Sequence, residues 1–184
     1  EVYNSSSDPD VRRRVLRAYM SHGDKTRLLA GARSEQNADL RMAAIRYLGS
    51  SGGTAELADL YAKETSPAIR TQIVRSFGAA GAVDRLQALA RSEKDPEVRM
   101  QVIRAFSMVG RERTGTALQD MYGTETTVDG KRAIIRSLRA QDNAEALVAI
   151  ARRETNADLK EYTVRQVSTM TKSKAALDYL MELL

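Results

Sequence analysis

Six arginines recur at nearly constant spacing and are the side chains best suited to bind a charged partner. They are separated by 29, 29, 29, 32 and 29 residues: Arg17, Arg46, Arg75, Arg104, Arg136 and Arg165. The planar guanidinium group can form two parallel hydrogen bonds with a carboxylate or a phosphate. The spacing therefore predicts a row of equivalent anion-binding groups, provided that the chain folds into repeated units.

Catalytic and metal-binding chemistry has few candidate residues in this sequence. The chain contains a single histidine, His22, and no cysteine. A catalytic triad would have to be built around His22 alone, and clusters of histidine and cysteine ligands for metals need more such residues. We therefore expect no enzyme activity, no metal and no cofactor, and we expect His22 in an exposed turn beside Gly23.

The segments that carry the arginines have the pattern of amphipathic helices. In the fourth segment, Val98, Val102, Ile103 and Phe106 fall on one face and Arg104 on the opposite face. Each segment is preceded by a preferred helix N-cap residue: Asp8, Asn37, Ser66, Asp95, Thr127 and Asn156. All three prolines directly follow such a cap, at Pro9, Pro67 and Pro96, where a missing N–H costs nothing. An internal period of this length predicts stacked helical units.

A second helix is expected between successive arginine segments. Residues 54–61, 83–90 and 144–150 carry narrow apolar stripes, and we assign Gly49, Gly78, Gly81 and Gly110 to turns. Two helices in each period of 29 residues predict helical hairpins. The expected fold is all-α, a right-handed α-solenoid of about six two-helix repeats.

The repeated pattern resembles HEAT repeats, in particular the short bacterial repeats similar to those of phycobilisome-lyase-like proteins. It is seen at Asp95, Pro96, Val98, Arg99 and Arg104 and covers nearly the whole chain. The resemblance implies a structural ladder of charges between repeats, with Glu35, Glu64, Glu93, Glu125 and Glu154 placed six residues before Arg41, Arg70, Arg99, Lys131 and Lys160. The first repeat has Ser6 at this position and is expected to lack the acidic partner.

The resemblance also implies that the arginine-bearing helices line a concave surface, along which the row would extend over roughly 40–50 Å. One turn before each arginine, on the same exposed side, lie Arg13, Met42, Thr71, Met100, Arg132 and Glu161. The candidate concave binding surface consists of Arg13, Arg17, Met42, Arg46, Arg75, Met100, Arg104, Arg132, Arg136 and Arg165. Two interpretations stay open. The arginines recognise an acidic partner, or they pair with acids of adjacent repeats such as Asp39 or Glu97.

Two parts of the sequence depart from the repeat. Residues 107–130 contain three extra residues, and Gly130 stands where other copies have valine, leucine or isoleucine. This is either a specialised loop or a neutral insertion. In the last helix, Leu177, Leu180, Met181 and Leu184 line one apolar face, and Tyr179 and Leu183 lie on another. Two apolar faces indicate a missing neighbour, a dimer contact or a short last helix that covers its own repeat.

Length and charge indicate how the repeats are used. We expect residues 1–184 to form a single repeat domain that starts at the end of an earlier repeat and belongs to a longer, bacterial chain. The formal charge of +5 favours acidic partners. The expected function is a protein–protein interaction scaffold that presents the arginines to an acidic or extended partner.

Two alternative functions stay open. One is nonspecific binding of nucleic acid or another polyanion, which would weaken steeply with salt. The other is service as an accessory or chaperone-like subunit of an enzyme, such as a bilin-lyase-like protein. No membrane span is expected, and both the cytoplasm and the periplasm are open as the compartment, as is the oligomeric state.

Overall fold

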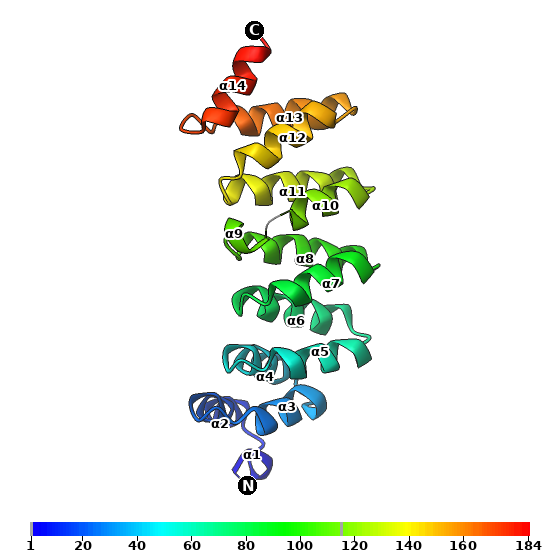
Figure 1. Ribbon diagram of the computed structural model, residues 1–184. Coiled ribbons are helices and arrows are strands. Elements are labelled where there is room, and N and C mark those ends of the chain that lie inside the picture. Colours follow the sequence, from blue (N-terminus) through cyan, green and yellow to red (C-terminus); the bar gives the residue numbers. More distant parts are fainter. Residues whose placement is uncertain (1, 115) are drawn as a thin grey trace. The chain divides into compact units, whose positions relative to one another are not determined.

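The computed structural model describes residues 2–114 and 116–184, and every regular element in those residues is an α-helix (Figure 1). The chain divides into two compact units, unit 1 comprising residues 1–86 and unit 2 comprising residues 87–184. Each unit is described by itself below.

Unit 1 is a stack of helical hairpins. It contains α1 (Val2–Ser5), α2 (Pro9–Ser21), α3 (Lys25–Ser34), α4 (Ala38–Ser50), α5 (Thr54–Lys63) and α6 (Pro67–Ala79), followed by the start of α7 (Val83–Ser92). The arginine-bearing helices α2, α4 and α6 pack against one another in chain order, and α3 packs against both α4 and α5. Leu16, Leu48 and Phe77 are fully buried or nearly so in this core.

Unit 2 repeats this construction. After the rest of α7 it contains α8 (Pro96–Ser107), α9 (Arg111–Thr114), α10 (Ala117–Thr124), α11 (Val128–Ala140), α12 (Ala144–Arg153), α13 (Ala157–Ser168) and α14 (Lys174–Glu182). Helices α8, α11 and α13 form the arginine-bearing layer, with α10 against α11 and α12 against α13 and α14. Stacked hairpins in both units are the construction of an α-solenoid, which confirms the predicted all-α repeat fold. The right-handed superhelix and the single domain over residues 1–184 stay predictions.

The predicted helix starts are confirmed by the capping geometry. The Asn37 side chain accepts hydrogen bonds from the backbone N–H groups of Asp39 at 3.0 Å and Leu40 at 3.1 Å. A side-chain oxygen accepts from the first helical turn in the same way at Asp8, Ser66, Asp95, Thr127 and Asn156. Because these caps satisfy otherwise unpaired donors, they fix where each arginine-bearing helix begins.

Two glycines that we assigned to turns lie inside helices instead. Gly49 belongs to α4 and Gly78 to α6. A Cβ atom on Gly49 would lie 2.9 Å from the Cβ of Ser76, closer than packed side chains approach. The small residue therefore serves the close packing of α4 on α6. The tight turn after α6 is made by Gly81, which has a φ of 63°.

The insertion in residues 107–130 replaces one regular first helix by the short α9 and an eight-residue α10. Gln141 links this segment to the neighbouring helices, since its side-chain amide donates to the carbonyls of Phe106 at 2.7 Å and Val109 at 2.9 Å. Its side-chain oxygen accepts from the Thr114 hydroxyl at 3.2 Å. The loop is thus integrated by hydrogen bonds into unit 2.

The last helix, α14, buries the second of its two apolar faces, the one that carries Tyr179. Ala176 and Tyr179 are buried, whereas Leu177 is 46% and Met181 70% exposed. The face with Leu177 and Met181 is therefore mainly solvent-exposed, because the helix turns its tyrosine inward.

Candidate functional site

The six periodic arginines project from the stacked second helices of the two units. Unit 1 presents Arg17 from α2, Arg46 from α4 and Arg75 from α6, and unit 2 presents Arg104 from α8, Arg136 from α11 and Arg165 from α13. All six are exposed to solvent, as their position opposite the apolar face predicts. We call these two sets of three the arginine rows.

Four of the six arginines in the arginine rows form no ion pair with the described residues. Among the described residues, the side chains of Arg17, Arg46, Arg104 and Arg136 make no hydrogen bond or ion pair. Pairing with Asp39 or Glu97, the alternative role considered for the arginines, therefore does not occur for Arg46 or Arg104. Arg165 differs, because it pairs with Glu161 one turn earlier in α13 at 2.5 Å.

The positions one turn before the arginine rows are less accessible than predicted. Arg13, Met42, Met100 and Arg132 are half-buried, and Thr71 is buried, whereas Glu161 is exposed. The guanidinium of Arg132 in α11 lies 5.5 Å from the ring centroid of Tyr162 in α13. Exposure was therefore wrongly predicted at five of the six positions and is confirmed at Glu161. At Arg132 the reason is that the side chain packs against the neighbouring helix α13.

A ladder of ion pairs connects neighbouring repeats within each unit. The observed ion pairs are Arg12 with Glu35 at 2.8 Å, Arg41 with Glu64 at 2.5 Å, Arg99 with Glu125 at 3.0 Å and Lys131 with Glu154 at 3.4 Å. Each base therefore pairs with the glutamate of the following repeat and not with the one six residues before it. The first repeat joins the ladder through Arg12 despite its Ser6. Lys160 makes no ion pair with the described residues. Arg70 lies in unit 1 and Glu93 in unit 2, so these two residues are not among the pairs inside each unit.

Each ladder glutamate has a second role at the start of the next helix. The Glu64 carboxylate also accepts from the backbone N–H of the cap residue Ser66 at 2.8 Å. Equivalent bonds run from Asn37 to Glu35, Asp95 to Glu93, Thr127 to Glu125 and Asn156 to Glu154. The side chain of Arg41 in turn donates to the Ala32 carbonyl at 2.9 Å. The Arg41–Glu64 pair thus connects the end of α3, through the Ala32 carbonyl, to the cap of α6 at Ser66 in the following repeat.

These bonds keep the buried carboxylates ionised. Burial is the largest single influence on Glu64 and acts to raise its pKa. The backbone hydrogen bond from Ser66 and the charge and hydrogen bond of Arg41 outweigh it, so the pKa lies below the ordinary 4.5. Burial also acts to raise the pKa values of Glu35, Glu125 and Glu154, and hydrogen bonds again lower them, first from Tyr3 at Glu35, from the Thr127 backbone at Glu125 and from Tyr122 at Glu154.

Tyrosines add a hydrogen bond at two of the ladder sites, a feature that sequence analysis missed. The hydroxyl of Tyr3 donates to Oε2 of Glu35, and the hydroxyl of Tyr122 donates to Oε2 of Glu154. The residue three positions before Ser6 and before each ladder glutamate alternates between tyrosine and alanine along the chain: Tyr3, Ala32, Tyr61, Ala90, Tyr122 and Ala151. This strict alternation is the signal that could have revealed the two kinds of ladder site.

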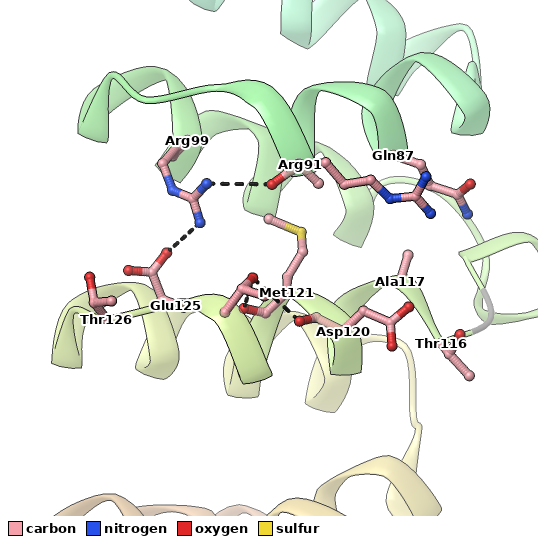
Figure 2. Close-up of a pocket in the computed structure, with 11 residues that line it drawn as sticks. Gln87, Arg91, Arg99, Thr116, Ala117, Asp120, Met121, Glu125 and Thr126 are labelled. Carbon is pink, nitrogen blue, oxygen red and sulfur yellow. Dashed lines mark hydrogen bonds and ion pairs between the residues drawn. The ribbon is translucent and has the colours of Figure 1, made fainter.

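Pockets accompany two of the ladder sites that carry alanine. In unit 2, a pocket of about 550 Å³ lies between α7 and α10, with the Arg99–Glu125 pair at one end (Figure 2). In unit 1, a pocket of about 410 Å³ contains the Arg41–Glu64 pair. The pocket at the tyrosine-bearing Lys131–Glu154 pair is smaller, at about 310 Å³.

His22 ends α2 as an exposed residue, and its Nδ1 lies 2.8 Å from the Ala18 carbonyl oxygen. In the part of the chain that the structure describes, no three histidine, cysteine or acidic side chains are grouped as metal ligands. None of the helices in residues 2–114 and 116–184 combines the length and apolar character that a membrane span requires.

Comparison with known proteins agrees with the stacked hairpins. Residues 54–139 match the family model described as HEAT repeats, a span that runs from α5 in unit 1 to α11 in unit 2. No curated protein matches the sequence. The narrower resemblance to phycobilisome-lyase-like repeats stays a prediction. The match and the hairpin stack together show that the chain contains HEAT repeats in residues 54–139.

Proposed function

We propose that the chain is a protein-interaction scaffold whose arginine rows bind an acidic or extended segment of a partner protein. HEAT repeats generally mediate protein–protein interactions, which supports a binding role. The observation that carries the proposal is that Arg17, Arg46, Arg104 and Arg136 are exposed at equivalent helix positions and that their side chains have no partner among the residues that the structure describes. A partner carboxylate can therefore bind these guanidinium groups without breaking an existing ion pair.

The arginine rows suit recognition more than stability. An exposed ion pair contributes about 0–1 kcal/mol, and an arginine without a partner contributes less, so stability alone gives little reason for arginine at these positions. The stacked helices hold the guanidinium groups on rigid elements, which reduces the entropy lost when an extended segment binds.

Affinity capture from a cell lysate with matched variants tests this function. We compare the wild type with an Arg46→Glu/Arg104→Glu variant, which alters one arginine in each unit. The control is Arg85→Glu/Lys172→Glu, which makes the same change in net charge at exposed residues that have no side-chain partner in the described structure. Circular dichroism confirms that all three proteins are folded.

We expect at least one protein to be captured by the wild type and by the control and to be lost with the arginine-row variant. Capture of the same proteins by all three would contradict the proposal. Loss of every captured protein after nuclease treatment would also contradict it, because the partner would then be a nucleic acid.

A further inference from the structure

The ladder sites of this protein exist in two forms, one with a phenol in place and one without. Tyr3 and Tyr122 occupy two of the sites, whereas Ala32 and Ala90 stand at the corresponding positions of two others. The tyrosine-bearing sites therefore indicate which ligand an alanine-bearing site can accept, namely a phenol.

The occupied sites show how a phenol is held. At the first, Oε2 of Glu35 accepts both from the Tyr3 hydroxyl and from the Arg12 guanidinium, which lies 2.8 Å away. The Arg12 guanidinium also lies 4.4 Å from the centroid of the Tyr3 ring, at cation–π distance. One carboxylate oxygen can thus accept hydrogen bonds from a basic side chain and from a phenol at the same time.

The second occupied site repeats this arrangement in unit 2. Oε2 of Glu154 accepts from the Tyr122 hydroxyl and lies 3.4 Å from Nζ of Lys131. Nζ of Lys131 is 4.9 Å from the centroid of the Tyr122 ring. Two tyrosines separated by more than 100 residues therefore make the same pair of contacts.

The site at Ala90 has the same charged pair without the ring. Oε1 of Glu125 is used by the backbone N–H of Thr127 at 2.9 Å and by its hydroxyl at 2.8 Å, while Oε2 pairs with Arg99 at 3.0 Å. Figure 2 shows this pair at one end of the pocket and the Met121 side chain rising into its middle. Ala90 and Met121 are among the lining residues and give the pocket an apolar part.

The size and polarity of the pocket indicate that more than an isolated ring is bound. A cavity of about 150 Å³ is enough for benzene, and this pocket measures about 550 Å³. Beyond the aromatic position it is lined by Arg91 and Asp120, whose side chains have no partner among the described residues. A donor and an acceptor at that end suit the carbonyl and N–H groups of a peptide backbone.

We propose that the pocket between α7 and α10 binds a tyrosine side chain from a segment of a partner protein. The phenol hydroxyl donates to Oε2 of Glu125, and the ring lies against Arg99 and Met121. This binding goes beyond the proposed function of the arginine rows and is independent of it, because the pocket uses none of the arginines in those rows. The smaller pocket at Arg41 and Glu64 in unit 1 is a second site of the same kind.

The first test is nuclear magnetic resonance of the methionine methyl groups in the whole chain. There are seven methionines, and a Met121→Leu spectrum assigns the Met121 signal. The probe is the capped tripeptide Gly-Tyr-Gly, compared with Gly-Phe-Gly and with p-cresol. We expect the tyrosine peptide to shift the Met121 signal and the phenylalanine peptide to bind at least about tenfold more weakly, because it lacks a hydrogen bond to a charged acceptor.

Two results of this experiment would overturn the proposal. Equal affinities for the tyrosine and phenylalanine peptides would mean that the hydroxyl is not recognised. Binding of p-cresol without binding of the tyrosine peptide would assign the pocket to a small phenol and not to a protein segment. This comparison uses the wild-type chain, so it does not depend on the folding of a variant.

The second test introduces a tyrosine of the chain itself into the pocket. Ala90→Tyr should place a phenol on Glu125 and abolish the shift that the tyrosine peptide causes in the Met121 signal, while the separate pocket in unit 1 is unchanged. Ala88→Tyr adds the same side chain at an exposed position of α7 and should bind the peptide as the wild type does. An undiminished shift of the Met121 signal in a folded Ala90→Tyr variant would contradict the proposal.

The arginine-row variant separates this inference from the proposed function. Arg46→Glu/Arg104→Glu leaves the pocket residues unchanged, so it should bind the tyrosine peptide with unchanged affinity. Tyrosine binding that disappears in this variant would assign the peptide to the arginine rows and overturn the pocket proposal.

Discussion

The guanidinium of Arg41 lies 2.5 Å from the carboxylate of Glu64, the ladder glutamate of the following repeat. The Arg41 side chain is 23% exposed and the Glu64 side chain 8%, so the pair is largely removed from solvent. Because Glu64 also accepts from the cap residue Ser66, the pair links two repeats to the start of a helix. This arrangement makes the ladder a structural element that is distinct from the exposed arginine rows.

Removal of Arg41 should destabilise the protein measurably. Arg41→Ala leaves the Glu64 carboxylate buried without its counter-charge, and we expect a loss of about 2–3 kcal/mol in the free energy of unfolding, slightly below the values for fully buried pairs. Urea denaturation followed by circular dichroism measures the change. The control is Lys160→Ala, since Lys160 is exposed and has no ion pair within the described residues. It should change stability by no more than about 0.5 kcal/mol, and an equal loss in both variants would contradict the role of the ladder.

Acid should destabilise the fold through the ladder glutamates. The folded-state pKa values of Glu35, Glu64, Glu125 and Glu154 are lowered relative to 4.5, so their contribution is complete above that pH and is lost as the pH falls through the folded values. Thermal unfolding measured from neutral pH downward should show a steep decrease in Tm below about pH 4.5. Glu64→Gln should make this decrease shallower, and an unchanged slope would argue against the lowered pKa of Glu64.

Alkaline titration should distinguish the ladder tyrosines from ordinary ones. Burial is the largest cause that raises the pKa values of Tyr3 and Tyr122, followed by the hydrogen bonds to Glu35 and Glu154. Because the neutral phenol is favoured in the folded state, stability from this source is complete below pH 10 and is lost as the pH rises further. Absorbance of the phenolate should show late ionisation of these tyrosines. The Tyr122→Phe variant should lose one late-ionising group, and an unchanged titration would contradict the assignment.

Close packing of α4 on α6 should make Gly49 intolerant of larger residues. Gly49→Val introduces atoms where a Cβ alone already lies 2.9 Å from the Cβ of Ser76, and we expect a loss of about 1–3 kcal/mol. The matched control is Gly123→Ala in α10, where a Cβ meets nothing within 4 Å and alanine should stabilise the helix by about 0.5–1 kcal/mol. Chemical denaturation measures both changes, and a neutral Gly49→Val would show that the two helices can separate without cost.

Local features of the fold were predictable from the sequence because local chemistry determines them. Caps such as Asn37 and Asp95, and the proline that follows Asp95, depend only on the first turn of each helix. Exposure of Arg46 and Arg104 follows from helical periodicity alone. The repeat spacing then indicates stacked hairpins.

Features that depend on how repeats stack were not predictable in the same way. Arg99 is close in sequence to Glu93, yet its guanidinium pairs with Glu125 of the next repeat and contacts Glu93 only through the backbone carbonyl, at 3.1 Å. Met42 and Met100 are half-buried although each lies one turn before an exposed arginine. The two larger of the three pockets described above lie at ladder sites where alanine replaces tyrosine, which becomes visible only when the repeats are placed together.

The most direct test of the central claim is the binding of an acidic peptide to the arginine rows. A fluorescently labelled glutamate-rich peptide is titrated with the wild type, with Arg46→Glu/Arg104→Glu and with the charge-matched Arg85→Glu/Lys172→Glu control, and anisotropy gives each Kd. We predict at least about tenfold weaker binding by the arginine-row variant, equivalent to about 1.4 kcal/mol, and nearly wild-type binding by the control. Equal weakening in both variants would show that only net charge attracts the peptide and would contradict the account.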